Sequence, residues 1–398
     1  MRFSFICRHA VAMYFFELYG CKTACRRSLS PRIMKRTFLY DSHISRGAAM
    51  APFGGFEMPI RYEGILAEHF AARKAAAIFD TCHMGEFSIT GPAAAADLDK
   101  IVSCPVASMK TGQCRYGFIC NRQGGVLDDQ IVYRLGETEF FMVVNASTQD
   151  ADFKWIKLNI SSETSLKNLS SETGKVDLQG PLSPKIINKL LERPIDDLSY
   201  YRWMHNEYKG QTILVSRTGY TGEIGFEIYL DERHTVSFWD DCIALGAQPA
   251  GLGARDTLRL EMGFPLYGHE LDETRNAAES GFKRALGPHK EFIGSPVVLD
   301  SRNVHHLLCG IKLDGRRTAR TGDVIRSTSG KTTGVITSGS FSPSLECAIA
   351  MGYIVTHDGV TGNKVIVAAE RSDLTGIVVE MPFYKSATAR QALSAFLA

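Results

Sequence analysis

The chain has 398 residues, of which 44% are hydrophobic and 22% are charged, a composition typical of a soluble globular protein with two or three domains. Its formal net charge of +2 hides an asymmetry, because residues 1–40 carry eight basic side chains and one acid. The remaining residues carry 37 bases and 42 acids. A mildly acidic body argues against a nucleic-acid-binding surface.

The basic N-terminal segment is the first predicted element. Its Arg-rich, acid-poor composition is typical of mitochondrial transit peptides, so the sequence predicts a transit peptide over residues 1–33 and a mitochondrial matrix location. The apolar stretch 10–19 is too short for a membrane span and leaves a secretory signal open as an alternative. Met34 is a second candidate start.

The segments after this leader predict mixed α and β structure. Apolar residues at helical spacing predict a helix over 63–78, and residues 87–90 read as a strand. Strands are also predicted over 130–135 and 140–144, joined by a polar turn in the manner of a hairpin. Helices mixed with hairpins favour α+β layers over a doubly wound parallel sheet.

The pattern of predicted secondary structure changes near residue 305. Residues 161–175 are polar and predict a surface loop or linker, and a helix is predicted over 234–245. Beyond 305, short strands alternate with turn signals, which is typical of a small all-β sandwich or barrel. These strands are predicted over 323–325, 334–337, 348–355, 364–368 and 376–380. We therefore expect α+β domains over 34–300 and a β-barrel-like domain over 301–398.

The most informative motif is the glycine-rich run 216–229, SRTGYTGEIGFEIY. Glycine at this density marks backbone with unusual angles or a close approach to a ligand. The alternating strand that follows places Phe226 and Ile228 on one face and Glu227 on the other. Together with Tyr220, the Glu227 carboxylate forms a candidate cradle for a flat, hydrogen-bonding heterocycle. A tight hairpin with an exposed acid is the alternative.

A second motif, residues 124–135 (GGVLDDQIVYRL), places two acids at the mouth of an apolar strand. Neighbouring strand residues point to opposite faces, so only one of Asp128 and Asp129 can face inward. An inward acid at a strand end is a candidate general base or electrostatic anchor. The alternative is a plain turn, because Gly-Gly and Asp-Asp commonly precede strands.

A third motif, residues 251–262 (GLGARDTLRLEM), predicts a short helix after Gly253. Arg255 and Arg259 are four residues apart and share one face of that helix. Near the helix start, the guanidinium of Arg255 adds to main-chain N–H donors, an environment suited to an electron-rich ligand oxygen. The alternative is an ordinary solvated face.

Other chemical signatures are missing from the sequence. The ten cysteines include no Cys-x-x-Cys pair, so we predict no metal site and reduced, mostly buried thiols. There is no dinucleotide-binding fingerprint, P-loop or Gly-x-Ser-x-Gly elbow. His83 is either a base or a hydrogen-bonded structural histidine.

In this order, the segments resemble the aminomethyltransferase (T-protein) family of the glycine cleavage system, over residues 35–381. The resemblance implies an α+β, three-domain, ring-like fold: two α+β domains and a C-terminal β-barrel-like domain around a cavity for tetrahydrofolate. Its landmarks are the segments 39–41, 53–55, 79–84, 124–129, 144–145, 178–181, 219–223, 254–256, 337–339 and 351–353.

The resemblance also implies a reaction. An aminomethyl group on the lipoyl arm of a partner, the H-protein, gives its carbon to tetrahydrofolate, which yields 5,10-methylenetetrahydrofolate, ammonia and dihydrolipoyl H-protein. No nucleic-acid or membrane partner is expected. The alternative is a folate-binding accessory protein for iron–sulfur cluster assembly, whose Lys-Gly-Cys-Tyr-type motif matches residues 113–116 (QCRY) poorly.

Site roles are carried over by position. Asp129 matches the catalytic aspartate of the family, Glu227 its pterin-binding glutamate, and Arg255 the arginine that meets the pterin from the other side. The residues that match further cofactor-contacting positions of the cavity are Met84, Asn145 and Tyr220.

Overall fold

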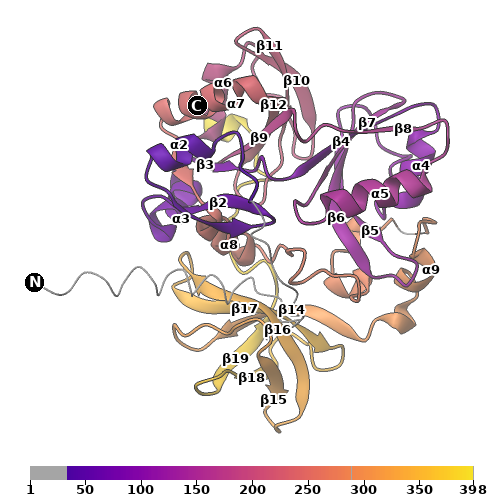
Figure 1. The fold of residues 1–398 in the computed structure, drawn as a ribbon. Coiled ribbons are helices and arrows are strands. Elements are labelled where there is room, and N and C mark those ends of the chain that lie inside the picture. Colours follow the sequence, from indigo (N-terminus) through magenta and orange to yellow (C-terminus); the bar gives the residue numbers. More distant parts are fainter. Residues whose placement is uncertain (1–33, 288, 398) are drawn as a thin grey trace, which may run out of the picture.

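The computed structural model describes residues 34–287 and 289–397; the predicted transit peptide at 1–33 lies outside the described residues. The described chain forms three lobes around a common centre (Figure 1). Two lobes are α+β, built on a six-stranded and a five-stranded sheet, and the third is a closed six-stranded barrel near the C-terminus. This arrangement confirms the predicted α+β fold with its C-terminal barrel.

The first lobe is organised by the six-stranded sheet. Its strands are, in spatial order, β10 (Trp203–Tyr208), β11 (Gln211–Ser216), β12 (Gly225–Asp231), β9 (Thr173–Gln179), β3 (Ala77–Asp80) and β13 (Gln248–Ala250). Helices α6 (Ser183–Leu190) and α7 (Glu232–Ala244) cover one face. Phe226 and Ile228 belong to the core under these helices, as the alternation in β12 predicts. The other face therefore carries the polar residues of β9 and β12.

The second lobe is organised by the five-stranded sheet. Its strands are, in spatial order, β5 (Cys114–Cys120), β6 (Val126–Arg134), β7 (Glu139–Val144), β4 (Gly85–Thr90) and β8 (Ser165–Asn168). Helices α4 (Ala94–Ile101) and α5 (Gln149–Asn159) share its hydrophobic core. The loop predicted over 161–175 is wrong, because β8 and the start of β9 lie within it. Their polar residues form strands because β8 pairs with β4 and β9 pairs with β3 and β12.

The barrel closes six antiparallel strands on one another. In spatial order they are β14 (His306–Leu313), β17 (Cys347–Val355), β16 (Thr332–Ser342), β15 (Val324–Ser327), β18 (Lys364–Ala368) and β19 (Leu374–Val379). The sequence predicted five of these strands and did not place β14. Apolar residues from all six strands fill the barrel interior.

Helix α8 (Leu252–Glu261) joins the first lobe to the barrel. It packs on α3 (Ile65–Lys74) and β2 (Phe56–Arg61) on one side and on β16 and β17 on the other. The helix predicted over 63–78 is shorter in the structure, since β3 follows it closely. The remaining elements are α2 (Tyr40–Ser45), β1 (Ala49–Phe53), β2 (Phe56–Arg61), η1 (Ala277–Ser280), η2 (Lys283–Ala285), α9 (Ser295–Val298), η3 (Ser301–Asn303) and α10 (Ser394–Leu397).

The β5–β6 turn packs against the segment that leads to the barrel, and Gly125 leaves no room there for a side chain. The N–H of Val126 donates to the carbonyl of Asp272 at 3.0 Å, and a Cβ on Gly125 would lie 1.8 Å from the carbonyl oxygen of Glu273. We expect Gly125→Ala to destabilise the fold by about 2 kcal/mol or more, because backbone must move. Thermal unfolding should show it, whereas Gly136→Ala, where a Cβ meets nothing nearer than 3.5 Å, should be neutral.

Candidate active site

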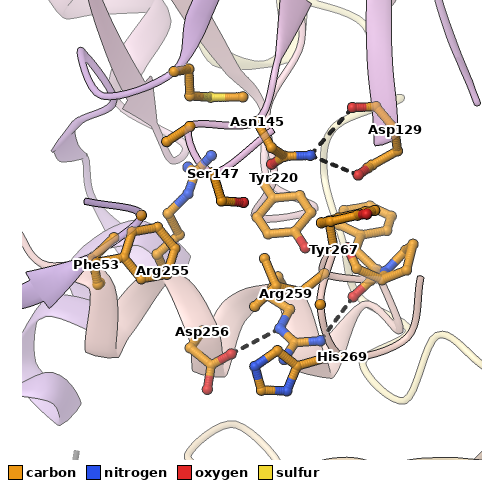
Figure 2. Close-up of a pocket in the computed structure, with 18 of the residues that line it drawn as sticks. Phe53, Asp129, Asn145, Ser147, Tyr220, Arg255, Asp256, Arg259, Tyr267 and His269 are labelled. Atoms are coloured by element: carbon orange, nitrogen blue, oxygen red, sulfur yellow. Dashed lines mark hydrogen bonds and ion pairs between the residues drawn. The ribbon is translucent and has the colours of Figure 1, made fainter. Parts of the chain in front are cut away.

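A cavity of about 3110 Å³ lies where the three lobes meet. Small-molecule sites usually occupy roughly 300–1,000 Å³, so this cavity has room for more than a single compact ligand. Helix α8 forms part of its wall (Figure 2). Side chains from both sheets and from barrel loops complete it. All six residues to which the resemblance gives site roles line it: Met84, Asp129, Asn145, Tyr220, Glu227 and Arg255.

One wall of the cavity presents the acid of β6. Asp129 lines the cavity, whereas Asp128 is fully buried on the opposite side of the strand, as strand alternation requires. The side-chain amide of Asn145 donates to both carboxylates, at 2.8 Å to Oδ1 of each (Figure 2 shows the bond to Asp129). The Tyr116 hydroxyl donates to Oδ2 of Asp129 at 2.9 Å. The carboxylate that faces the cavity is therefore held at both oxygens.

The pKa of Asp129 is raised to about 7. Burial is the largest cause, and the neighbouring charge of Asp128 adds to it, while the hydrogen bonds from Tyr116 and Asn145 oppose it. Burial also raises the pKa of Asp152, behind Asp128, to about 7. A carboxyl group with a pKa near neutrality suits proton exchange with a ligand at physiological pH.

The opposite wall carries a buried ionic cluster on the cavity face of the six-stranded sheet. Lys175 Nζ lies 2.5 Å from Glu227 Oε1 and 3.0 Å from Asp177 Oδ1. Arg255 Nη1 of α8 lies 2.7 Å from Asp177 Oδ2. Both partners, Lys175 and Arg255, lower the pKa of the buried Asp177 against the opposing effect of burial. Two cations and two carboxylates thus balance in charge where Glu227 and Arg255 reach the cavity.

Lys175, Asp177 and Tyr116 were missed in the sequence. The run Lys175-Val-Asp177-Leu alternates polar and apolar residues, and its apolar members belong to the core of the first lobe. That alternation is the signal of a strand with one polar face, but it was obscured by the polar residues before it. Tyr116 carried no comparable signal.

The glycine-rich loop packs closely against the cavity wall. A Cβ on Gly222, whose φ is +80°, would lie within 2.3–2.8 Å of Met262 side-chain atoms, so the position requires glycine. Tyr220 stacks on Phe264 with 5.7 Å between ring centroids, and its hydroxyl donates to the carbonyl of Pro265. The Arg255 guanidinium lies 5.0 Å from the centre of the Tyr220 ring. The loop thus presents a fixed aromatic surface beside the ionic cluster.

His83 lies at the cavity edge beside Met84. Its ring makes edge contacts with Phe53 and Phe56, and its Nδ1 has no hydrogen-bond partner. Burial lowers its pKa to about 4. The ring is therefore neutral at pH 7 and a weak base, and it lacks the hydrogen bond expected for a structural histidine at Nδ1.

No metal site is found among the described residues, since none of their His, Cys, Asp and Glu side chains gather in groups of three or more that could bind an ion. The seven cysteines of the described part are free thiols, and six of them are buried. Within residues 34–287 and 289–397, none of the helices combines the length and apolar character needed to cross a bilayer.

The fold and the site define a ligand-binding protein in which two α+β lobes and a C-terminal barrel enclose one cavity with a titratable acid and an ionic clamp. The family model described as GCVT N-terminal domain matches residues 39–290, and that described as glycine cleavage T-protein C-terminal barrel domain matches 307–385. The chain belongs to the glycine cleavage T-protein family, the aminomethyltransferases.

Individual relatives agree with this family. The chain is 40% identical to an aminomethyltransferase of Halothermothrix orenii, over 88% of this chain and 100% of the relative. It is 36% identical to one of Thermotoga maritima, over 90% of this chain and 100% of the relative. The crystal structure of glycine cleavage system aminomethyltransferase T from Bartonella henselae superposes with a TM-score of 0.84 at 30% identity, covering 89% of this chain and 99% of that one.

The predicted mitochondrial location is wrong. The relatives reported above are bacterial aminomethyltransferases, and bacteria have no mitochondria. The prediction rested on the basic composition of residues 1–33, and composition alone does not distinguish a targeting segment from another basic N-terminal sequence.

Proposed function

We propose that the protein is the aminomethyltransferase that moves the one-carbon unit of an aminomethyl group from the lipoyl arm of an H-protein to tetrahydrofolate. Family membership supports the reaction class. The observation that carries the proposal is that Asp129 and the Glu227–Arg255 pair, from opposite walls, line one cavity.

The ionic cluster is suited to the pterin end of the acceptor. A pterin presents a 2-amino group next to a ring N–H, and a carboxylate such as Glu227 accepts two parallel hydrogen bonds from such an edge. Arg255 supplies N–H donors for the ring's carbonyl oxygen. The ring of Tyr220, fixed by Phe264 and Pro265, offers a flat packing surface.

With the pterin in that clamp, the reacting nitrogens N5 and N10 extend toward Asp129. The carbon leaves its bonds to sulfur and to the amine nitrogen, and it forms bonds to N5 and N10. The two N–H protons of the folate end on ammonia and on the lipoyl thiol, so the atoms balance. Asp129, with a pKa of about 7, accepts one of these protons as the C–N bond forms and passes it to the leaving group.

The cavity also has room for the carrier's lipoyl arm. Its volume of about 3110 Å³ is several times that of a typical ligand site. Barrel-side loops at its border carry basic side chains, which suit an acidic carrier surface and steer its approach. These side chains are Arg316, Arg317, Arg320 and Arg371.

The proposal is tested by mixing the purified protein with aminomethylated H-protein and tetrahydrofolate and following 5,10-methylenetetrahydrofolate and ammonia. We expect both products only when all three components are present. Folate binding without product formation would instead support the accessory-protein alternative, which the relatives' shared name of aminomethyltransferase does not favour.

A further inference from the structure

We infer that Lys175 and Thr218 are positioning residues that hold the Glu227 carboxylate with one unfilled acceptor position on each oxygen, directed to a ligand edge with two adjacent N–H donors. This inference rests on the proposed function and deepens it, because it assigns the selectivity for such an edge to two residues that do not line the cavity.

The ammonium group of Lys175 is held in place by three hydrogen bonds. It is fully buried, and each of its three N–H bonds has an acceptor: Glu227 Oε1 at 2.5 Å, Asp177 Oδ1 at 3.0 Å and the Thr81 hydroxyl at 3.2 Å. An ammonium group has three donors and no acceptor, so this set satisfies it completely. Oε1 of Glu227 is therefore fixed by a cation that is itself fixed on two other sides.

The second oxygen of Glu227 is fixed by a chain of hydroxyl groups. The Thr218 hydroxyl donates to Oε2, and it lies 2.7 Å from the Ser216 hydroxyl. Ser216 lies 3.3 Å from the Tyr133 hydroxyl, which lies 2.9 Å from that of Tyr229. All these residues except Thr218 lie on sheet strands. The row of hydroxyl groups therefore connects the Glu227 carboxylate to the sheets of both lobes.

The count of acceptor positions gives the ligand selectivity. A carboxylate has about four lone-pair sites, two on each oxygen. Lys175 and Thr218 fill one on each, and Glu227, 5% exposed at the cavity wall, keeps the other two side by side. A ligand that lacks one of two adjacent N–H groups would leave a desolvated carboxylate oxygen without a partner, which is costly.

The charge of the cluster adds a second requirement. Lys175 and Arg255 balance Asp177 and Glu227, so the four charges sum to zero without a ligand. A cationic edge would place an unpaired charge in this buried cluster, whereas a neutral edge would not. The matching ligand edge is a neutral amino-heterocycle with two adjacent N–H groups.

The test compares tetrahydrofolate with an analogue that lacks the 2-amino group, by calorimetry on wild type, Thr218→Val and Lys175→Met. We expect wild type to prefer tetrahydrofolate by about 30-fold or more, and Thr218→Val to bind it about 10-fold more weakly with a preference below about 5-fold. Lys175→Met should lose more of the affinity for tetrahydrofolate than Thr218→Val does. The matched control is Thr212→Val, an exposed threonine on β11, which should keep wild-type values.

Thr218→Val carries the test if Lys175→Met does not fold, because it removes one hydroxyl and no charge. Its kcat at saturating tetrahydrofolate should stay within about threefold of wild type, since it leaves Asp129 untouched. An unchanged preference, whether or not both ligands bind more weakly, would show a merely structural role and overturn the inference while leaving the proposed function intact. Failure of wild type to bind tetrahydrofolate would overturn both.

Discussion

Replacing Asp129 by asparagine should remove most of the transferase activity and leave the fold intact. The carboxylate accepts hydrogen bonds from Tyr116 and Asn145 and faces the cavity. Asparagine keeps the shape, and it can accept from Asn145 through its oxygen and donate to the Tyr116 hydroxyl, which is able to turn and accept. It cannot act as a proton acceptor. Loss of a general base typically lowers the rate about 10²- to 10⁴-fold. We therefore expect kcat to fall by that range in the complete assay, with a tetrahydrofolate Kd within about threefold of wild type.

The control for this variant is Asp150→Asn, which removes an exposed acid from α5 in the same lobe. Circular dichroism and thermal unfolding establish that both variants fold. Near-normal turnover by folded Asp129→Asn would rule out the proposed role of this carboxylate, whatever the affinity for folate.

The pH dependence gives an independent check on the same group. Because the pKa of Asp129 is raised to about 7, wild-type kcat/KM should increase with pH across that value if the ionised form accepts the proton. The same group also makes the stability of the fold depend on pH, because Asp129 is an acid whose pKa rises on folding. Its contribution is full below the unfolded value of 3.8 and is lost as pH rises to about 7. Asp129→Asn should therefore gain stability relative to wild type between pH 4 and pH 8.

The sequence locates the residues that line the cavity better than it locates the buried residues that hold them in place. Glu227 and Asp129 follow glycine-rich turns into strands. Alternation correctly placed Glu227 opposite the apolar Phe226 and Ile228, whereas for β6 it required only that Asp128 and Asp129 face opposite sides and did not say which of them faces the cavity. Arg255 was placed by helical spacing. Each of these signals is local, because it lies within a single short stretch of the sequence. The roles assigned to the three residues stay proposals.

The partners of these residues were not predictable in the same way. Lys175 lies in a polar stretch that suggests a loop, and only its pairing with Asp177 and Glu227 across two strands allows a lysine to be buried there. A lysine in sequence usually indicates an exposed position, since burying an unpaired ammonium is costly. Its burial follows from tertiary structure, so a local pattern could not show it.

Replacing Glu227 by glutamine should separate binding from catalysis in the opposite sense. Glutamine retains the length of the side chain, but it puts an NH₂ donor where Lys175, Thr218 and the ligand edge all donate. One donor must then face another, and Lys175 and Arg255 are left with Asp177 alone. Loss of a charged hydrogen-bonding partner in a buried site costs about 2–5 kcal/mol, or roughly 30-fold or more in Kd.

We therefore expect Glu227→Gln to weaken tetrahydrofolate binding by about 100-fold in calorimetry, and Glu227→Ala to weaken it at least as much. Turnover at saturating folate should fall far less than in Asp129→Asn, because the proton-accepting group is on the other wall of the cavity. Glu232→Gln, an exposed glutamate at the start of α7, is the control and should bind normally. If folded Glu227→Gln bound tetrahydrofolate as tightly as wild type, the pterin would have to lie elsewhere in the cavity, and the division of labour between its two walls would be wrong.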